Sequence, residues 1–294
     1  MSKAAKWPIA MTIAGSDPGG GAGLQADLKT FAAFRIYGFS IITAVIAQNS
    51  ARVARVQPID AAMVADQIAT LAAERIPDAL KTGALANAAV VTAVAKAIED
   101  FALPAPVVDP VLLSSSGARL LDVDGERALL TRLFPLARVI TPNIPEAATL
   151  SGIEIDGPPT MRAAARKLRR LGARAVVIKG GHDFSGEHTA SLKRKSVGAT
   201  HKSVSVIHKS ISVTHSTDLL FDGRSFTEFT ARRIAGDGAH GTGCAFSAAI
   251  AARLARGDDL EAAVRKAKAF VSRAMRARFI LSEHGRPLLD HFAR

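Results

Sequence analysis

Cysteine, aromatic residues and long apolar runs are all scarce in this chain. Its 294 residues include one cysteine, Cys244, which excludes a disulfide framework and a cysteine-based zinc site and fits a reducing compartment. Only 5% of the residues are aromatic, so the core formed by the 48% that are hydrophobic must be mainly aliphatic. No run of about 18 apolar residues is present, so no transmembrane helix is expected. We therefore expect a cytoplasmic protein without a membrane partner.

Positive charge is in excess, but its distribution does not indicate a nucleic-acid partner. Lys and Arg number 38 against 26 Asp and Glu, which gives a formal net charge of +12. The basic residues are spread over helix-like segments such as 162–170 and 253–278, without the interleaved aromatics that single-strand binding favours. We therefore expect a solvated basic surface, which is compatible with a small anionic substrate.

Short apolar runs alternate with helical patterns along the chain. Strands are predicted over residues 9–14, 40–47, 79–81, 106–109, 137–140 and 175–179, and helices over 25–34, 61–73, 88–101, 125–133, 161–171, 243–254 and 260–278. This alternation predicts an α/β protein with a mainly parallel central sheet and helices on both faces. No segment has the composition of a linker, so we expect a single domain over residues 1–294.

One segment, at about 187–216, departs from this pattern and is predicted to be a surface insertion. It is polar, and residues 201–206 are nearly repeated by residues 208–213, so histidines recur every seven residues. A metal-binding tract is one interpretation, but this spacing alternates faces of an extended chain, so the imidazoles would not converge. We favour a solvated loop, or a β-hairpin whose apolar side faces the protein.

A glycine-rich segment from Gly15 to Gly23 follows the first predicted strand and precedes the first predicted helix. Ligands of open α/β sheets bind beyond the carboxyl ends of the strands, and glycines let them approach the backbone closely. The spacing does not match a dinucleotide fingerprint, and no GxxxxGK[ST] phosphate loop is present. By itself the segment fits a plain turn or a ligand-binding loop, and Asp17 fits a turn cap or a site residue.

Asn143 and Glu146 are three residues apart, just after a predicted strand, where a helix begins. Hard oxygen ligands in this arrangement suit a hydrated Mg²⁺ ion. The same residues also suit a helix cap, with Asn143 as the capping residue, Pro145 in the first turn and Glu146 at the N3 position. The segment alone leaves both interpretations open.

The segment His240-Gly241-Thr242-Gly243-Cys244 opens a late predicted helix. Small residues there expose successive backbone N–H groups at the positive end of the helix, which makes an anion site. A cysteine in that first turn should have its thiolate favoured. Glycine and threonine are also common at ordinary helix starts. A further signal is Lys179, followed by two glycines and a histidine at a strand end, which supplies a mobile positive charge.

The order of these motifs along the chain carries a family resemblance. It closely resembles the ribokinase-like superfamily, and within it the hydroxymethylpyrimidine/phosphomethylpyrimidine kinases of thiamine biosynthesis. The resemblance implies an α/β ribokinase-like fold that phosphorylates the hydroxymethyl group of an aminopyrimidine and then the resulting monophosphate, with ATP and Mg²⁺. It runs from about residue 9 to 275, and its motifs are residues 14–27, 109–111, 141–146, 179–182 and 240–244.

The resemblance also implies roles for individual residues. Gly241, Thr242 and Gly243 would form the anion hole and Cys244 would be the base, where sugar kinases of the superfamily carry Asp. Lys179 would meet the phosphates, with Asn143, Glu146 and Asp109 organising Mg²⁺ and phosphate. The residues near the aminopyrimidine would be Gly15, Asp17, Ala22, Asp27, Ile46, Gln48, Ala84 and Val111. The carboxamide of Gln48 both donates and accepts hydrogen bonds, which suits an aminopyrimidine edge.

Two departures from the family pattern, and two other functions, accompany this interpretation. The family often has Lys-Asn-Thr before its His-Gly-Thr-Gly-Cys, whereas this chain has Asp237-Gly238-Ala239, which bears on nucleotide affinity. The insertion is the second departure. A relaxed kinase for pyridoxine or pyridoxal and a non-catalytic ligand-binding regulator are the alternatives. Because the family is usually dimeric, a homodimer is implied.

Overall fold

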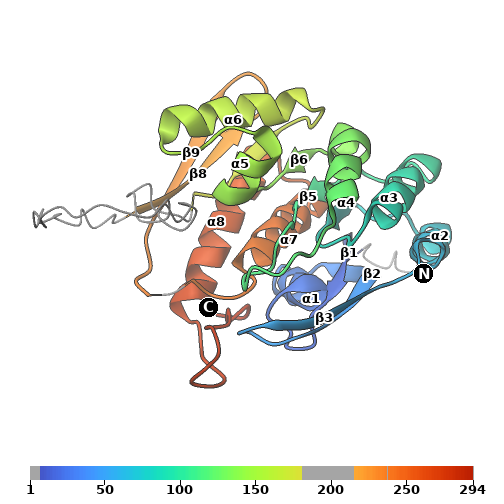
Figure 1. The fold of residues 1–294 in the computed structure, drawn as a ribbon, viewed down its shortest axis with the longest axis horizontal. Coiled ribbons are helices and arrows are strands. Elements are labelled where there is room, and N and C mark those ends of the chain that lie inside the picture. The colour runs from blue at the N-terminus through green and yellow to red at the C-terminus, as the bar shows by residue number, and fades with distance from the viewer. Residues whose placement is uncertain (1–6, 181–214, 237, 294) are drawn as a thin grey trace, which may run out of the picture.

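The computed structural model describes residues 7–180, 215–236 and 238–293 (Figure 1). Most of the predicted insertion therefore lies outside the described residues. Its predicted C-terminal boundary is wrong, because residues 215 and 216 already belong to a sheet strand, β8. Within the described residues, no helix is both long enough and apolar enough to span a bilayer.

A nine-stranded sheet in the order β3-β2-β1-β4-β5-β6-β7-β8-β9 forms the centre of the fold. The six strands from β2 to β7 in that order run parallel, while β3, β8 and β9 pair antiparallel with their neighbours. The strands are β1 (Ile9–Ser16), β2 (Tyr37–Gln48), β3 (Val53–Pro58), β4 (Ala79–Thr82), β5 (Val107–Val108), β6 (Val139–Ile140), β7 (Val176–Ile178), β8 (His215–Phe221) and β9 (Phe226–Arg232).

Helices cover both faces of this sheet, as the sequence predicts (Figure 1). One hydrophobic cluster joins the sheet to α2–α6, and a second joins the other face to α1, α7 and α8. A π-helical turn (Leu129–Leu133) and a 3₁₀ turn (Phe134–Leu136) follow α4. The helices are α1 (Gly23–Ala33), α2 (Ala61–Glu74), α3 (Ala88–Asp100), α4 (Val123–Ala128), α5 (Ile144–Ser151), α6 (Pro158–Arg170), α7 (Thr242–Ala255) and α8 (Leu260–Arg276).

The strands are apolar on both faces because both faces are covered. Side chains alternate between faces along a strand, so neighbouring residues enter different cores. Val107, for example, belongs to the cluster that contains α7 and α8, whereas Val108 belongs to the cluster that contains α3. This alternation explains why the central strands read as short continuous apolar runs and were predicted correctly.

The sequence analysis missed the edge strands β3 and β9, the strand β8 beside β9, and one helix. β3 and β9 contain exposed Arg, Gln, Glu or Thr side chains because one of their sides faces solvent, so they lack a continuous apolar run. The short helix α5 was predicted only as a helix start at Asn143, since its eight residues are too few for a clear helical period.

Candidate active site

A row of polar side chains follows the apolar residues of the parallel strands, on the face of the sheet that α1 and α7 cover. Each lies two residues beyond a core residue of that face, and therefore points the same way. Because parallel strands end at the same edge of the sheet, these side chains collect where α/β proteins bind ligands. The row consists of Thr12, Lys81, Asp109, Thr141 and Lys179.

The first buried cluster in this row joins Asp27 of α1 to Thr12 and Lys81. The Thr12 hydroxyl donates to Asp27 Oδ2 over 2.6 Å, and Lys81 Nζ lies 2.7 Å from the same oxygen. Both charged side chains are 0% exposed. Burial raises the pKa of Asp27 despite the neighbouring Lys81 ammonium. Burial by itself would lower the pKa of Lys81, but the Asp27 carboxylate outweighs it and raises that pKa.

Asp27 itself has no exposed surface. Its aminopyrimidine contact, which the resemblance implies, stays a prediction. Its second oxygen, Oδ1, is buried without a hydrogen-bond partner among the described residues.

The second cluster joins Lys179 to Asp109 beside the start of α7. Lys179 Nζ lies 2.8 Å from Asp109 Oδ1, and the hydroxyl groups of Thr141 and Ser247 each donate to the Asp109 carboxylate over 3.3 Å. Burial would lower the pKa of Lys179, but Asp109 and then Glu146 raise it. A Cβ atom on Gly243 would lie 3.1 Å from Lys179 Nζ, so this ammonium sits at the backbone of the first helical turn. The structure thus brings the predicted Lys179 and Gly243 together.

Asn143 and Glu146 form a complete capping box at the start of α5. Asn143 Oδ1 accepts a hydrogen bond from the Glu146 backbone N–H, and Glu146 Oε2 accepts one from the Asn143 N–H, both over 2.8 Å. Burial raises the pKa of Glu146 to about 7, although Lys179 acts in the opposite direction. Of the two interpretations left open by the sequence, the helix cap is therefore realised in the structure.

These oxygens fit Mg²⁺ only in its hydrated form. The described residues contain no group of three or more His, Cys, Asp and Glu side chains able to hold a metal ion. The carboxylates of Asp109 and Glu146 do flank the Lys179 ammonium, since both act on its pKa. Mg²⁺ commonly keeps several waters and binds through one or two carboxylates together with substrate phosphates, which this donor set allows.

The glycine-rich loop is tied together by Asp17 at its centre. The backbone N–H groups of Gly19, Gly21 and Ala22 donate to its carboxylate, and His240 Nε2 lies 3.2 Å from Oδ2. Burial would raise the pKa of Asp17, but hydrogen bonds, first from His240 and then from the backbone, lower it to about 2. Asp17 is 1% exposed. The Asp17 carboxylate therefore acts as the anchor of the loop, and the predicted substrate contact at Asp17 stays a prediction.

Three predicted aminopyrimidine neighbours gather in one small apolar cluster. Ile46, Ala84 and Val111 pack there with Ala44 and Leu120, at the carboxyl edge of the sheet. The predicted Gly15 borders this cluster, since a Cβ atom on it would lie 2.9 Å from the terminal methyl carbon of Ile46.

Gln48 ends the strand that carries Ile46, and its side chain is half-buried. Its carboxamide acts on the Asp17 carboxylate and helps to lower the pKa of that group, which relates the strand end to the glycine-rich loop. The structure therefore places an amide that both donates and accepts beside an apolar wall.

Cys244 is the third residue of α7 and lies against the first residue of α1. The Gly23 backbone N–H donates a hydrogen bond to its sulfur, and the side chain keeps some exposed surface. Burial nevertheless raises the pKa of the thiol to about 11. The expectation that the helix start favours the thiolate is therefore wrong for the ligand-free chain. Desolvation, with the negative charges of Asp27 and Asp109, outweighs the backbone N–H groups and the Lys81 ammonium.

The profile of the phosphomethylpyrimidine kinase family matches residues 17–288. The chain belongs to this family. It is 40% identical over 285 residues to the hydroxymethylpyrimidine/phosphomethylpyrimidine kinase of Bacillus subtilis, covering 97% of this chain and 94% of that relative. It is 41% identical over 266 residues to the thiamine biosynthesis bifunctional protein ThiED of Geobacter sulfurreducens, covering 90% of this chain and 49% of the relative. The chain thus spans about half the length of that relative.

A solved kinase structure shares the fold. The pyridoxal kinase of Staphylococcus aureus in complex with AMP-PCP and pyridoxal superposes with a TM-score of 0.80 at 31% identity, covering 98% of this chain and 94% of that chain. The predicted α/β fold of the ribokinase-like type is therefore confirmed.

Several site residues of this phosphomethylpyrimidine kinase family member were missed by the sequence analysis. Lys81 was treated as the end of an apolar strand, although a lysine there needs a buried partner and is itself a signal. Ser247 and Ser115 gave no local signal. Ser115 contacts His240 Nδ1 over 3.1 Å, so it joins the segment after β5 to the glycine-rich loop through one imidazole.

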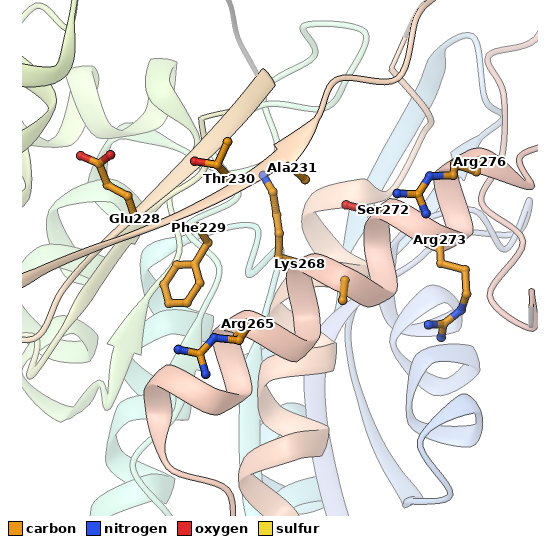
Figure 2. Close-up of a pocket in the computed structure, with 10 residues that line it drawn as sticks. Glu228, Phe229, Thr230, Ala231, Arg265, Lys268, Ser272, Arg273 and Arg276 are labelled. Atoms are coloured by element: carbon orange, nitrogen blue, oxygen red, sulfur yellow. The ribbon is translucent and has the colours of Figure 1, made fainter. Parts of the chain in front are cut away.

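This chain also has a cleft of about 590 Å³ between β9 and α8, and the cleft lies apart from these residues (Figure 2). None of the site residues predicted from the sequence lines it. Figure 2 shows the cationic side chains that α8 presents along the cleft: Arg265, Lys268, Arg273 and Arg276. Two of these already have acidic partners, since Arg265 pairs with Glu261 and Lys268 with Asp218. We therefore assign the chemistry to the strand-end site.

Proposed function

We propose that the chain transfers the γ-phosphoryl group of ATP to the hydroxymethyl group of 4-amino-5-hydroxymethyl-2-methylpyrimidine, and then phosphorylates the monophosphate to the diphosphate for thiamine diphosphate biosynthesis. The observation that carries this proposal is that two chemically different groups of residues lie at the carboxyl edge of the sheet. An apolar cluster with Gln48 forms one group, and Lys179 with the start of α7 forms the other. Membership of the phosphomethylpyrimidine kinase family supports it.

In the proposed complex, the pyrimidine ring lies against the apolar cluster. Ile46, Ala84 and Val111 supply an apolar wall, and the Gln48 carboxamide pairs with the amino group and ring nitrogen of the substrate. The hydroxymethyl group then points towards Cys244 and the start of α7.

The phosphate end supplies positive charge where negative charge develops. Phosphoryl transfer is catalysed mainly by positioning and electrostatic stabilisation, which the Lys179 ammonium and the N–H groups of residues 241–243 provide. Mg²⁺, when bound near Asp109, Asn143 and Glu146 through water and phosphate oxygens, would neutralise charge on the phosphates. ATP use fits the named kinase relatives.

The substrate hydroxyl must lose its proton as its oxygen bonds to the γ-phosphorus and ADP departs. We assign the acceptor of this proton to Cys244 in its thiolate form. Because burial holds the pKa of the free thiol at about 11, the thiolate is a minor form of the ligand-free chain at neutral pH. Groups that favour the thiolate therefore bear directly on the rate.

A pyridoxal kinase activity is the second candidate. It is favoured by the shared fold of the Staphylococcus aureus enzyme, whose structure contains pyridoxal. The apolar cluster would also accept a pyridine ring, so the fold alone does not separate the two substrates.

A coupled assay of ADP release separates the candidates. The full chain, ATP and Mg²⁺ are combined with the hydroxymethylpyrimidine, its monophosphate, or pyridoxal, and a mock purification from cells that do not express the chain serves as the control for contaminating kinases. We expect ADP release with the first two compounds. Release with pyridoxal alone would support the second candidate, and release with none would support a non-catalytic regulator.

We also propose a homodimer, a single domain over residues 1–294 and a cytoplasmic location. Support comes from the family resemblance, the continuous sheet of the described residues and the lone cysteine. Sedimentation equilibrium at several protein concentrations tests the dimer.

A further inference from the structure

The buried pair of Lys81 and Asp27 has no part in the chemistry described so far. Both side chains are 0% exposed, and Lys81 Nζ lies 2.7 Å from Asp27 Oδ2. Buried ion pairs are weak evidence for stability, since well-packed apolar residues often replace them without loss. Asp27 also keeps one buried oxygen without a hydrogen-bond partner among the described residues. The pair therefore calls for a role other than holding the core together.

Its position is set by three elements that meet at Cys244. Lys81 lies on β4 beside Thr12 of β1, and both point towards the face that α1 and α7 cover. Helix α7 packs against both β4 and α1. The pair thus lies between the sheet and the helix that carries the thiol.

The contact between α1 and Cys244 also places the Lys81–Asp27 pair close to the sulfur. Gly23, the first residue of α1, donates its N–H to the Cys244 sulfur. Asp27 follows one turn later on the same face of that helix, and its carboxylate holds Lys81. The ammonium and the sulfur are therefore neighbours in a buried, low-dielectric environment, where charges act strongly on each other.

We propose that Lys81 is a positioning residue for phosphoryl transfer, whose ammonium, held in place by Asp27, stabilises the Cys244 thiolate that accepts the substrate proton. This inference rests on the proposed function of Cys244. When the thiol ionises its proton passes to solvent water. The thiolate then takes the hydroxyl proton as the new O–P bond forms and the bond to ADP breaks, which restores the thiol.

Four charged groups act on the sulfur, and they come from every side of it. Lys81 of β4 favours the thiolate, and Asp27 of α1 and Asp109 after β5 oppose it. Lys179 after β7 also interacts with the sulfur. Because each lysine is paired with an aspartate, the two pairs are nearly neutral overall. The Lys81 ammonium acts on the sulfur more strongly than the Asp27 carboxylate does, so the first pair favours the thiolate.

The single cysteine makes the inference testable without measuring catalysis. The rate of alkylation by iodoacetamide as a function of pH, followed by mass spectrometry, reports the ionisation of Cys244 alone. We expect Lys81→Met to raise the midpoint of this profile by about one pH unit or more, and Asp27→Asn to lower it by a similar amount. Lys96→Met, at an exposed lysine paired with Asp100, should leave the midpoint unchanged.

A double variant, Lys81→Met with Asp27→Leu, covers the case in which a single change leaves a buried charge unpaired and the chain does not fold. It contains no unpaired charge, so its circular dichroism should match that of the wild type. We expect a raised alkylation midpoint, and a kcat for the first phosphorylation at least tenfold lower while the pyrimidine KM changes little.

The outcomes separate this inference from the proposed function. The pair is only structural if the alkylation midpoint of the double variant equals that of the wild type. The same conclusion follows if both single variants shift the alkylation midpoint equally and in the same direction. If the wild-type chain phosphorylates no pyrimidine but the midpoints shift as expected, the electrostatic role stands and the proposed function fails. If a wild-type kcat accompanies a raised midpoint, the thiolate does not limit the reaction and the inference is overturned.

Discussion

At the scale of single residues, two opposing effects act on the pKa of the Cys244 thiol. The N-termini of α1 and α7 both begin beside its sulfur, and such helix ends favour an anion. Burial opposes them and raises the pKa of the thiol to about 11. Cys244 is therefore mainly a thiol at neutral pH. A thiol is a poor target for oxidation, because the thiolate is the reactive form.

Replacing Cys244 tests its role as the base. Cys244→Ala should keep the fold and ATP binding but lower kcat of the first phosphorylation by about 10²–10⁴-fold, the usual contribution of a general base. The second phosphorylation should fall less, because its attacking phosphate is already largely deprotonated at neutral pH. Cys244→Asp should restore part of the rate. Steady-state kinetics of both steps provide the measurement, and equal losses in the two would indicate that Cys244 only positions the substrate.

Gln48 is the residue that we propose to pair with the polar edge of the pyrimidine. Gln48→Ala would leave polar atoms of the bound pyrimidine unpaired, at a cost of about 1–3 kcal/mol. We expect the KM for the pyrimidine to rise at least fivefold while the KM for ATP stays near the wild-type value. Gln57→Ala on the exposed strand β3 is the matched control. A pyrimidine KM that does not change would exclude Gln48 from the substrate contacts.

Glu146 gives the stability of the chain a distinctive pH dependence. Its pKa is raised from 4.5 to about 7 in the folded chain, so between these values the native state binds a proton that the unfolded state has lost. Stability should therefore fall as the pH rises through this window. Glu146→Gln should flatten this part of the profile, measured by urea denaturation with EDTA present. The exposed Glu99→Gln change on α3 should not alter the profile. An unchanged slope in Glu146→Gln would contradict the assignment.

At the scale of elements, the site depends on how closely the glycine-rich loop approaches the start of α7. Gly241 has a φ of +82°, and a Cβ atom on it would lie 1.8 Å from the Gly21 carbonyl oxygen. The backbones of the two motifs are therefore in direct contact, although they lie far apart in the sequence. His240 adds a side-chain link through Asp17. Backbone and side-chain contacts thus hold the glycine-rich loop against the start of α7.

A pair of glycine variants separates backbone strain from this contact. Gly257 has a similar φ of +87° but no atom within 4 Å of its Cβ position. Gly257→Ala should cost only the strain of the left-handed conformation, about 1–2 kcal/mol, and keep full activity. Gly241→Ala adds a clash with Gly21, so it should cost clearly more and abolish phosphoryl transfer. Urea denaturation and the coupled assay measure both, and equal costs would show that the contact is not needed.

At the scale of the whole molecule, the sheet separates two cores and gathers the charges at one edge. The apolar clusters on its two faces are aliphatic, as the shortage of aromatic residues predicted. Two lysine–aspartate pairs lie at this edge, Lys81 with Asp27 and Lys179 with Asp109. The excess of positive charge elsewhere resides mostly on exposed helix faces such as that of α6.

The amino-acid sequence alone determined the alternating α/β pattern, the family and the types of residue that carry the chemistry. These follow from local signals. The signals are short apolar runs that alternate with helical patterns, glycines beyond the strand ends, and motifs that occur in a specific order along the chain. The Asn143–Glu146 segment could be assigned only as a choice between a cap and a metal site, because both use the same atoms. The structure describes residues 7–180, 215–236 and 238–293, and most of the insertion lies outside them. The insertion therefore stays a prediction.

Only the tertiary structure decided which groups are buried together and in what protonation state. The pairing of Lys81 with Asp27 joins residues 54 positions apart, and that of Asp17 with His240 joins residues 223 apart. No local pattern encodes such pairs, since they arise when strands and helices pack. Burial likewise reverses the pKa that the helix start predicts for Cys244. Desolvation depends on every neighbouring element at once, and that is why the sequence named the reactive sulfur but not its state of ionisation.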